Sequence, residues 1–148
     1  MANGVGAAPR SAFFDEQSPT ARIQRMLEKA FPGHVVSLLS ATRDNARILV
    51  KVDSGHNPGD WFLFNTATRE AAFLTARNRW FDRDGGASVR PVTLAARDGM
   101  PLHGFLTVPH GSDGRGLPMV VKPHGGPIGE FDDGSFERDN QLLAAAGY

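Results

Sequence analysis

Four short stretches of alternating apolar and polar residues between residues 34 and 74 constrain the fold of this chain most. They are His34–Ser40, Ala46–Val52, Asp60–Asn65 and Glu70–Leu74, and turn-rich segments separate them. Alternation predicts β-strands, because successive side chains of a strand point to opposite faces of a sheet. Four strands in sequence are typical of one blade of a β-propeller or one sheet of a sandwich. A single sheet cannot bury both of its faces, so we expect further structure around it.

Residues 1–33 are predicted to form a lead-in with an amphipathic helix over residues 18–31. Ser18 suits the N-cap and Pro19 suits the first helical position. Apolar residues then recur at helical spacing and predict one buried stripe: Ile23, Met26, Leu27, Ala30 and Phe31. Gly33 can adopt the left-handed conformation that ends many helices.

Composition excludes several classes of function. The sequence has no cysteine, which excludes disulfides, thiolate metal sites and a cysteine nucleophile. Basic and acidic residues number 16 each, so no net charge favours nucleic acid or an anionic membrane. The longest apolar runs are too short to span a bilayer, and the first ten residues do not resemble a secretory signal. The histidines lack metal-ligand spacing. We therefore expect a cytoplasmic protein without metal, cofactor, nucleic-acid partner or membrane partner.

The chain changes character near residue 88. Residues 76–88 are charged and glycine-containing, which predicts a connector. A β-hairpin is then expected from Val89–Ala96 and Leu102–Pro109. The turn between them contains Asp98-Gly99, a strong hairpin signal because glycine adopts positive φ without steric cost.

The last 31 residues predict an α/β unit. Pro118–Lys122 is a short apolar run of the kind that is buried in parallel sheets. A Pro-His-Gly-Gly-Pro loop follows, and Ser135–Gly147 is predicted to be a helix with Ser135 as its N-cap. Two glycines in such a loop allow close approach of the backbone to a substrate, and its amides can point at a developing oxyanion. The alternative for these residues is a tight turn with an incidental histidine.

Three stretches occur in a characteristic order: VRPVTLAARDGMPLHGFLTVP, then LPMVVKPHGGP, then QLLAAAGY. Together they resemble the prolyl oligopeptidase family (S9) of serine peptidases, particularly its acylaminoacyl-peptidase and dipeptidyl-aminopeptidase-like branch. Upstream, residues 31–74 look like the last part of that family's propeller. The resemblance covers most of residues 13–148.

The resemblance implies a mixed fold class, β and then α/β. Residues 34–75 would be the last part of a β-propeller, and residues 89–148 the start of an incomplete α/β-hydrolase domain. The implied activity is hydrolysis of short peptides by a Ser-Asp-His triad through an acyl-enzyme. The implied oxyanion-hole loop is His124, Gly125, Gly126 and Pro127. Relatives with a Tyr-Gly-Gly version place an oxyanion-stabilising tyrosine before the glycines, so His124 has either that role or a scaffold role.

No serine of this chain lies in the Gly-x-Ser-x-Gly sequence of a nucleophile elbow. Ser88 and Ser112 come nearest, but each lacks one of the two glycines and precedes the His-Gly-Gly loop. We therefore expect the triad to lie beyond Tyr148 and the chain to be inactive alone. Its partners would be a peptide substrate and the missing C-terminal half of the domain. The alternative is a stand-alone, non-catalytic β-rich binding or interaction domain with hydrolase ancestry.

Overall fold

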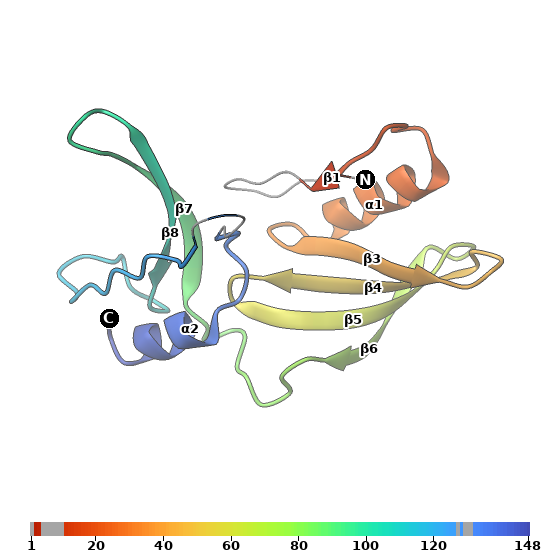
Figure 1. Cartoon of the computed structure of the whole chain (residues 1–148). Helices are drawn as coiled ribbons and strands as arrows, with labels where there is room; N and C mark the ends of the chain where they lie inside the picture. Colours follow the sequence, from red (N-terminus) through yellow and green to blue (C-terminus); the bar gives the residue numbers. More distant parts are fainter. Residues whose placement is uncertain (1, 4–10, 127, 129–131) are drawn as a thin grey trace.

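The computed structural model describes residues 2–3, 11–126, 128 and 132–148. Figure 1 shows a four-stranded antiparallel sheet, a separate β-hairpin and two helices. The sheet has the order β3-β4-β5-β6, and its strands are β3 (Val35–Ala41), β4 (Arg47–Ser54), β5 (Asn57–Asn65) and β6 (Glu70–Ala76). Two short strands, β1 (Ala2–Asn3) and β2 (Ser11–Ala12), pair with each other near the N-terminus.

The four predicted strands are confirmed, because the alternation in the sequence matches the faces of the sheet. Val50 lies opposite Leu38 on β3 and opposite Phe62 on β5, so these three side chains share one face. The buried core lies on this face and includes Val36, Ile48, Val50, Val52 and Phe64.

Helix α1 (Pro19–Ala30) covers the β3 side of this core (Figure 1). Ser18 is its N-cap, and its Oγ accepts a hydrogen bond from the Ala21 amide at 3.3 Å. Leu27 joins the core, and the buried Gln24 donates from Nε2 to the Val36 carbonyl at 2.8 Å. The predicted helix and its glycine stop are confirmed, since Gly33 has φ +76°.

Replacing Ser18 with alanine is expected to lower the free energy of unfolding by about 1 kcal/mol. The change removes the acceptor for the Ala21 amide, one of the donors at the helix start that has no partner within the helix. Urea unfolding followed by circular dichroism measures the loss. Thr20→Ala, at an exposed position of the same first turn, is the matched control and is expected to cause no loss. Equal effects of the two changes would contradict the capping role.

The predicted hairpin is also confirmed. It consists of β7 (Ser88–Ala95) and β8 (Pro101–Val108), with Gly99 at φ +85° in the turn. Helix α2 (Arg138–Ala145) contacts β8 but is shorter than predicted. Its N-cap is Glu137, whereas Ser135 lies before the helix, so the prediction of Ser135 as N-cap was wrong. Neither of the described helices is long and apolar enough to cross a membrane.

The expected fold class was wrong. The described residues form a small, mostly β structure, with no closed propeller or barrel and no α/β-hydrolase pattern among them. All of the paired strands are antiparallel, and Pro118–Lys122 forms no strand. Pro118 and Pro123 lack the N–H that a ladder needs, and no described strand pairs with this segment.

Candidate functional site

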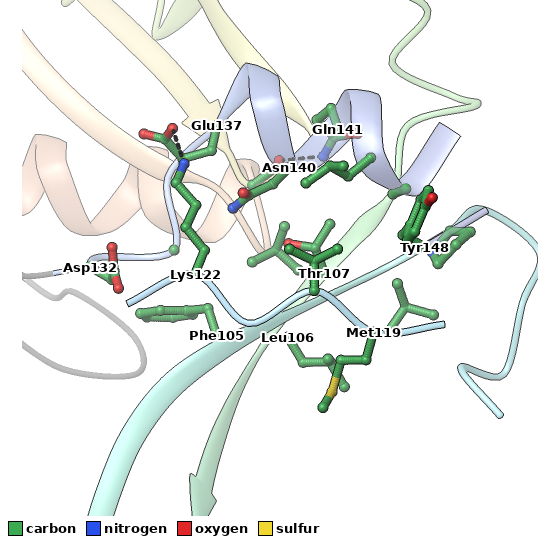
Figure 2. A pocket seen from close by; sticks show the side chains of 18 of the residues that line it. Phe105, Leu106, Thr107, Met119, Lys122, Asp132, Glu137, Asn140, Gln141 and Tyr148 are labelled. Atoms are coloured by element: carbon green, nitrogen blue, oxygen red, sulfur yellow. Dashed lines mark hydrogen bonds and ion pairs between the residues drawn. The ribbon is translucent and has the colours of Figure 1, made fainter. Parts of the chain in front are cut away.

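A cavity of about 600 Å³ lies between the hairpin, the segment 114–124 and α2 (Figure 2). Its walls are both apolar and polar. The apolar side chains include Phe105, Leu106, Val108, Met119, Val120 and Leu143. The polar side chains include Lys122, His124, Glu137, Asn140, Gln141 and Tyr148. A cavity of this volume is within the range that binds small molecules and short peptides.

Gln141 fixes the α2 wall of the cavity. Its Oε1 accepts from the Ala87 amide at 2.8 Å, and its Nε2 donates to the Ala87 carbonyl at 3.1 Å. The same Nε2 donates to the Gly55 carbonyl, in the turn between β4 and β5, at 2.9 Å. The residue is only 6% exposed, so these bonds form away from water. One side chain thus holds α2 against both the connector and the four-stranded sheet.

The predicted oxyanion loop lies on the rim of this cavity. His124 is exposed, and its Nδ1 lies 2.6 Å from the Gly125 carbonyl. Because a carbonyl oxygen can only accept, Nδ1 carries the proton, and in the neutral ring Nε2 is an acceptor. Pro127 lies outside the described residues.

The two glycines of the loop face open space. Among the described residues, a Cβ on Gly125 would meet nothing within 4 Å, and a Cβ on Gly126 would meet only the Ile128 amide nitrogen, at 3.8 Å. Packing within the described residues therefore does not require glycine at either position. If the glycines are needed because another group lies close to the loop backbone, that group would be a ligand or a further polypeptide segment.

One ion pair crosses the rim, as Figure 2 shows: Lys122 reaches Glu137, with Nζ and Oε2 separated by 3.8 Å. Both side chains are more than half exposed, so the pair stabilises the fold by less than about 1 kcal/mol. Asp132 and Asp133 add carboxylates to the lining, and Asp133 Oδ1 accepts from the Ser135 amide at 2.9 Å. The rim therefore carries more acidic than basic side chains.

The described residues contain no catalytic triad. Ser54 Oγ lies 3.4 Å from His56 Nδ1, but Ser54 is buried and a substrate cannot reach it. Thr93 Oγ1 lies 3.2 Å from His103 Nδ1 on the exposed surface of the hairpin. Neither histidine has a carboxylate hydrogen-bond partner in this part of the chain. The same part holds no group of three or more histidine, aspartate or glutamate side chains that could bind a metal ion.

Sequence reasoning identified His124 but missed the residues that build the walls of the cavity, among them Gln141, Lys122 and Glu137. A glutamine in a short helix gives no local signal of burial, and its partners lie 54 and 86 residues away in the chain.

No protein family, curated protein or solved structure matches this chain. Membership of the prolyl oligopeptidase family therefore stays a prediction from the order of the three motifs.

Proposed function

We propose that this chain is a non-catalytic part of a serine peptidase similar to the prolyl oligopeptidase family, which hydrolyses short peptides through an acyl-enzyme. The nucleophile, its histidine base and the acidic residue would lie beyond Tyr148. The protein would act in the cytoplasm on a peptide substrate and without a cofactor.

One observation carries the proposal: the three motifs that carry the resemblance line the same cavity. Phe105 comes from the Arg-Asp-Gly hairpin, His124 from the His-Gly-Gly loop, and Tyr148 from the QLLAAAGY stretch. These residues are distant in sequence, and the resemblance alone did not require them to meet around one space. A shared cavity is what a substrate-binding role for the three motifs needs.

Within this proposal the backbone of the loop, and not the imidazole of His124, is the oxyanion donor. The neutral ring uses its one N–H on the Gly125 carbonyl, so no second ring N–H remains for an oxyanion. Donors to a developing negative charge then come from the amides of Gly125 and Gly126, which are both exposed residues. His124 acts as a scaffold that orients the Gly125–Gly126 peptide group, which carries the Gly126 amide.

A fluorophosphonate probe, which labels activated serines covalently, tests the proposal on the natural protein purified from its source. Mass spectrometry of the labelled peptide is expected to identify a serine in a Gly-x-Ser-x-Gly sequence beyond residue 148. Residues 1–148 produced alone, at the same concentration, are the control and are expected to remain unlabelled. Labelling of a serine within residues 1–148 would contradict the proposal. An unlabelled natural protein would also contradict it and would favour the stand-alone binding domain.

A further inference from the structure

The turn between β4 and β5 joins the four-stranded sheet to the rest of the molecule. Its Gly55 carbonyl accepts from Gln141 of α2, and its Gly55 backbone packs directly on Val89 of β7. The next residue, His56, packs against Gly86 of the connector: a Cβ on that glycine would lie 3.3 Å from the His56 Cβ. A single turn therefore holds the hairpin, the connector and α2 in place.

A second histidine faces this turn. The rings of His34, which precedes β3, and His56 lie edge to face, with centroids 5.8 Å apart and an interplanar angle of 66°. His34 Nδ1 lies 3.0 Å from the Pro32 carbonyl, so that nitrogen carries the proton in the neutral ring. His56 Nδ1 lies 3.4 Å from Ser54 Oγ. Two neutral imidazoles fit this arrangement, whereas two imidazolium ions would repel each other.

The charged groups near His56 offset only part of the repulsion between two protonated rings. Burial lowers the pKa of His56 below its ordinary value, proximity of His34 lowers it further, and Asp84 of the connector acts in the opposite direction. Arg83 of the connector is paired with Asp60 of β5, and Asp82 accepts from the Asp84 amide. The residues that meet the turn from β7 and α2, Val89 and Gln141, are uncharged.

We propose that the His34–His56 pair is an acid-sensitive latch between the four-stranded sheet and the module of connector, hairpin and α2. The latch is closed while the two rings are uncharged. Protonation of the half-buried His56 ring as the pH falls separates the two rings and loosens the turn from the connector and from α2, while the sheet keeps its own ladder.

The direction of the pH dependence follows from linkage. In the unfolded chain His56 has its ordinary pKa of 6.5, and in the folded chain its pKa is lower. Between these two values the opened state binds a proton that the closed state does not, so opening becomes more favourable as the pH falls. The closed contact is therefore fully stable above about pH 6.5 and weakens as the pH falls from there through the lowered folded value.

Native-state hydrogen exchange at pH 7.5 and 5.0 tests the latch, with each rate divided by the intrinsic rate at the same pH. The Ala87 amide, which donates to Gln141, is expected to lose protection several-fold at pH 5.0. The Val50 amide at the centre of the sheet is expected to keep its protection. His34→Asn and His56→Gln should each abolish most of the pH effect at Ala87. His103→Gln, on the exposed hairpin, is the matched control and should leave it unchanged.

Two results would overturn the latch. One is that the Ala87 amide of the wild-type chain keeps its protection at pH 5.0. The other is that His34→Asn and His56→Gln lose as much protection at Ala87 as the wild-type chain does. Should His56→Gln fail to fold, an NMR titration of the wild-type histidines decides the question without it. The pKa of His56 is expected to lie below its ordinary value of 6.5, and in His34→Asn to move upward toward that value. A pKa of His56 at or above 6.5 would overturn the proposal.

Discussion

Replacing Gln141 with leucine is expected to lower the free energy of unfolding by about 2–3 kcal/mol, although leucine suits a buried helical position. The change leaves the Ala87 amide without its acceptor and the Ala87 and Gly55 carbonyls without their donor. Buried polar groups that lose their partners retain the full cost of desolvation, which the added apolar contact of leucine does not recover. Urea unfolding measures the change in free energy.

Leu142→Ala provides the matched control for this prediction. Leu142 is the next residue of α2, but its side chain is 63% exposed, so its truncation removes little buried area. We expect a loss below about 0.5 kcal/mol. If Gln141→Leu is as mild as Leu142→Ala, α2 does not depend on the Gln141 hydrogen bonds for its position.

Features of this fold that depend on neighbouring residues could be predicted from the sequence. The α1 helix follows from Ser18, Pro19 and an apolar stripe, all within 14 residues. The hairpin follows from Asp98-Gly99, because the turn needs the positive φ that Gly99 adopts. The four strands follow from alternation, which the buried core face of the sheet requires.

The start of α2 shows where local patterns misled. Ser135 is a favourable N-cap residue, but its amide donates to Asp133 Oδ1, and Gly134 between them has φ +71°. Ser135 is therefore part of a local turn that precedes the helix, and α2 starts only at Arg138. The competing interaction involves the same kinds of residue that cap helices, so sequence alone does not separate the two.

The segment Pro118–Lys122 could not be predicted for a different reason. Its apolar run indicates a preference for burial, but a strand exists only when another strand pairs with it. Met119 and Val121 are 75% and 74% exposed, so the described chain covers only a small part of either residue. Local composition predicts that such a segment tends to form a buried strand. Whether the strand forms depends on a second strand that pairs with it. The predicted parallel sheet was wrong because no described strand pairs with this segment.

The candidate site depends partly on a local sequence motif and partly on contacts between distant segments. His124 was found from a short motif, whereas the cavity beside it depends on contacts between segments that are distant in the chain. Gln141 and Gly55 are 86 residues apart, and no periodicity or turn signal links them. The position of the loop relative to α2 therefore had to come from the structure.

Replacing Gly55 with alanine is expected to lower the free energy of unfolding by about 1–3 kcal/mol, because the site has no room for a methyl group. The added Cβ would lie 2.5 Å from the Val89 Cβ and 3.0 Å from the Gly134 carbonyl oxygen. The Cβ of Val89 is bonded directly to its backbone, so it cannot rotate out of the way. Relief of the overlap would require movement of β7 away from the turn. Urea unfolding measures the loss.

Gly125→Ala is the matched control, since its Cβ would enter open space and its backbone does not have positive φ. We expect it to change the free energy of unfolding by less than about 0.5 kcal/mol. A double-mutant cycle with Val89→Gly tests the stated cause, because that change removes the two nearest atoms that the new methyl group meets and leaves only the Gly134 carbonyl oxygen. If the overlap is the cause, the double variant loses less stability than the sum of the two single variants. Strict additivity would mean that Gly55 matters for a reason other than its contact with Val89 of β7.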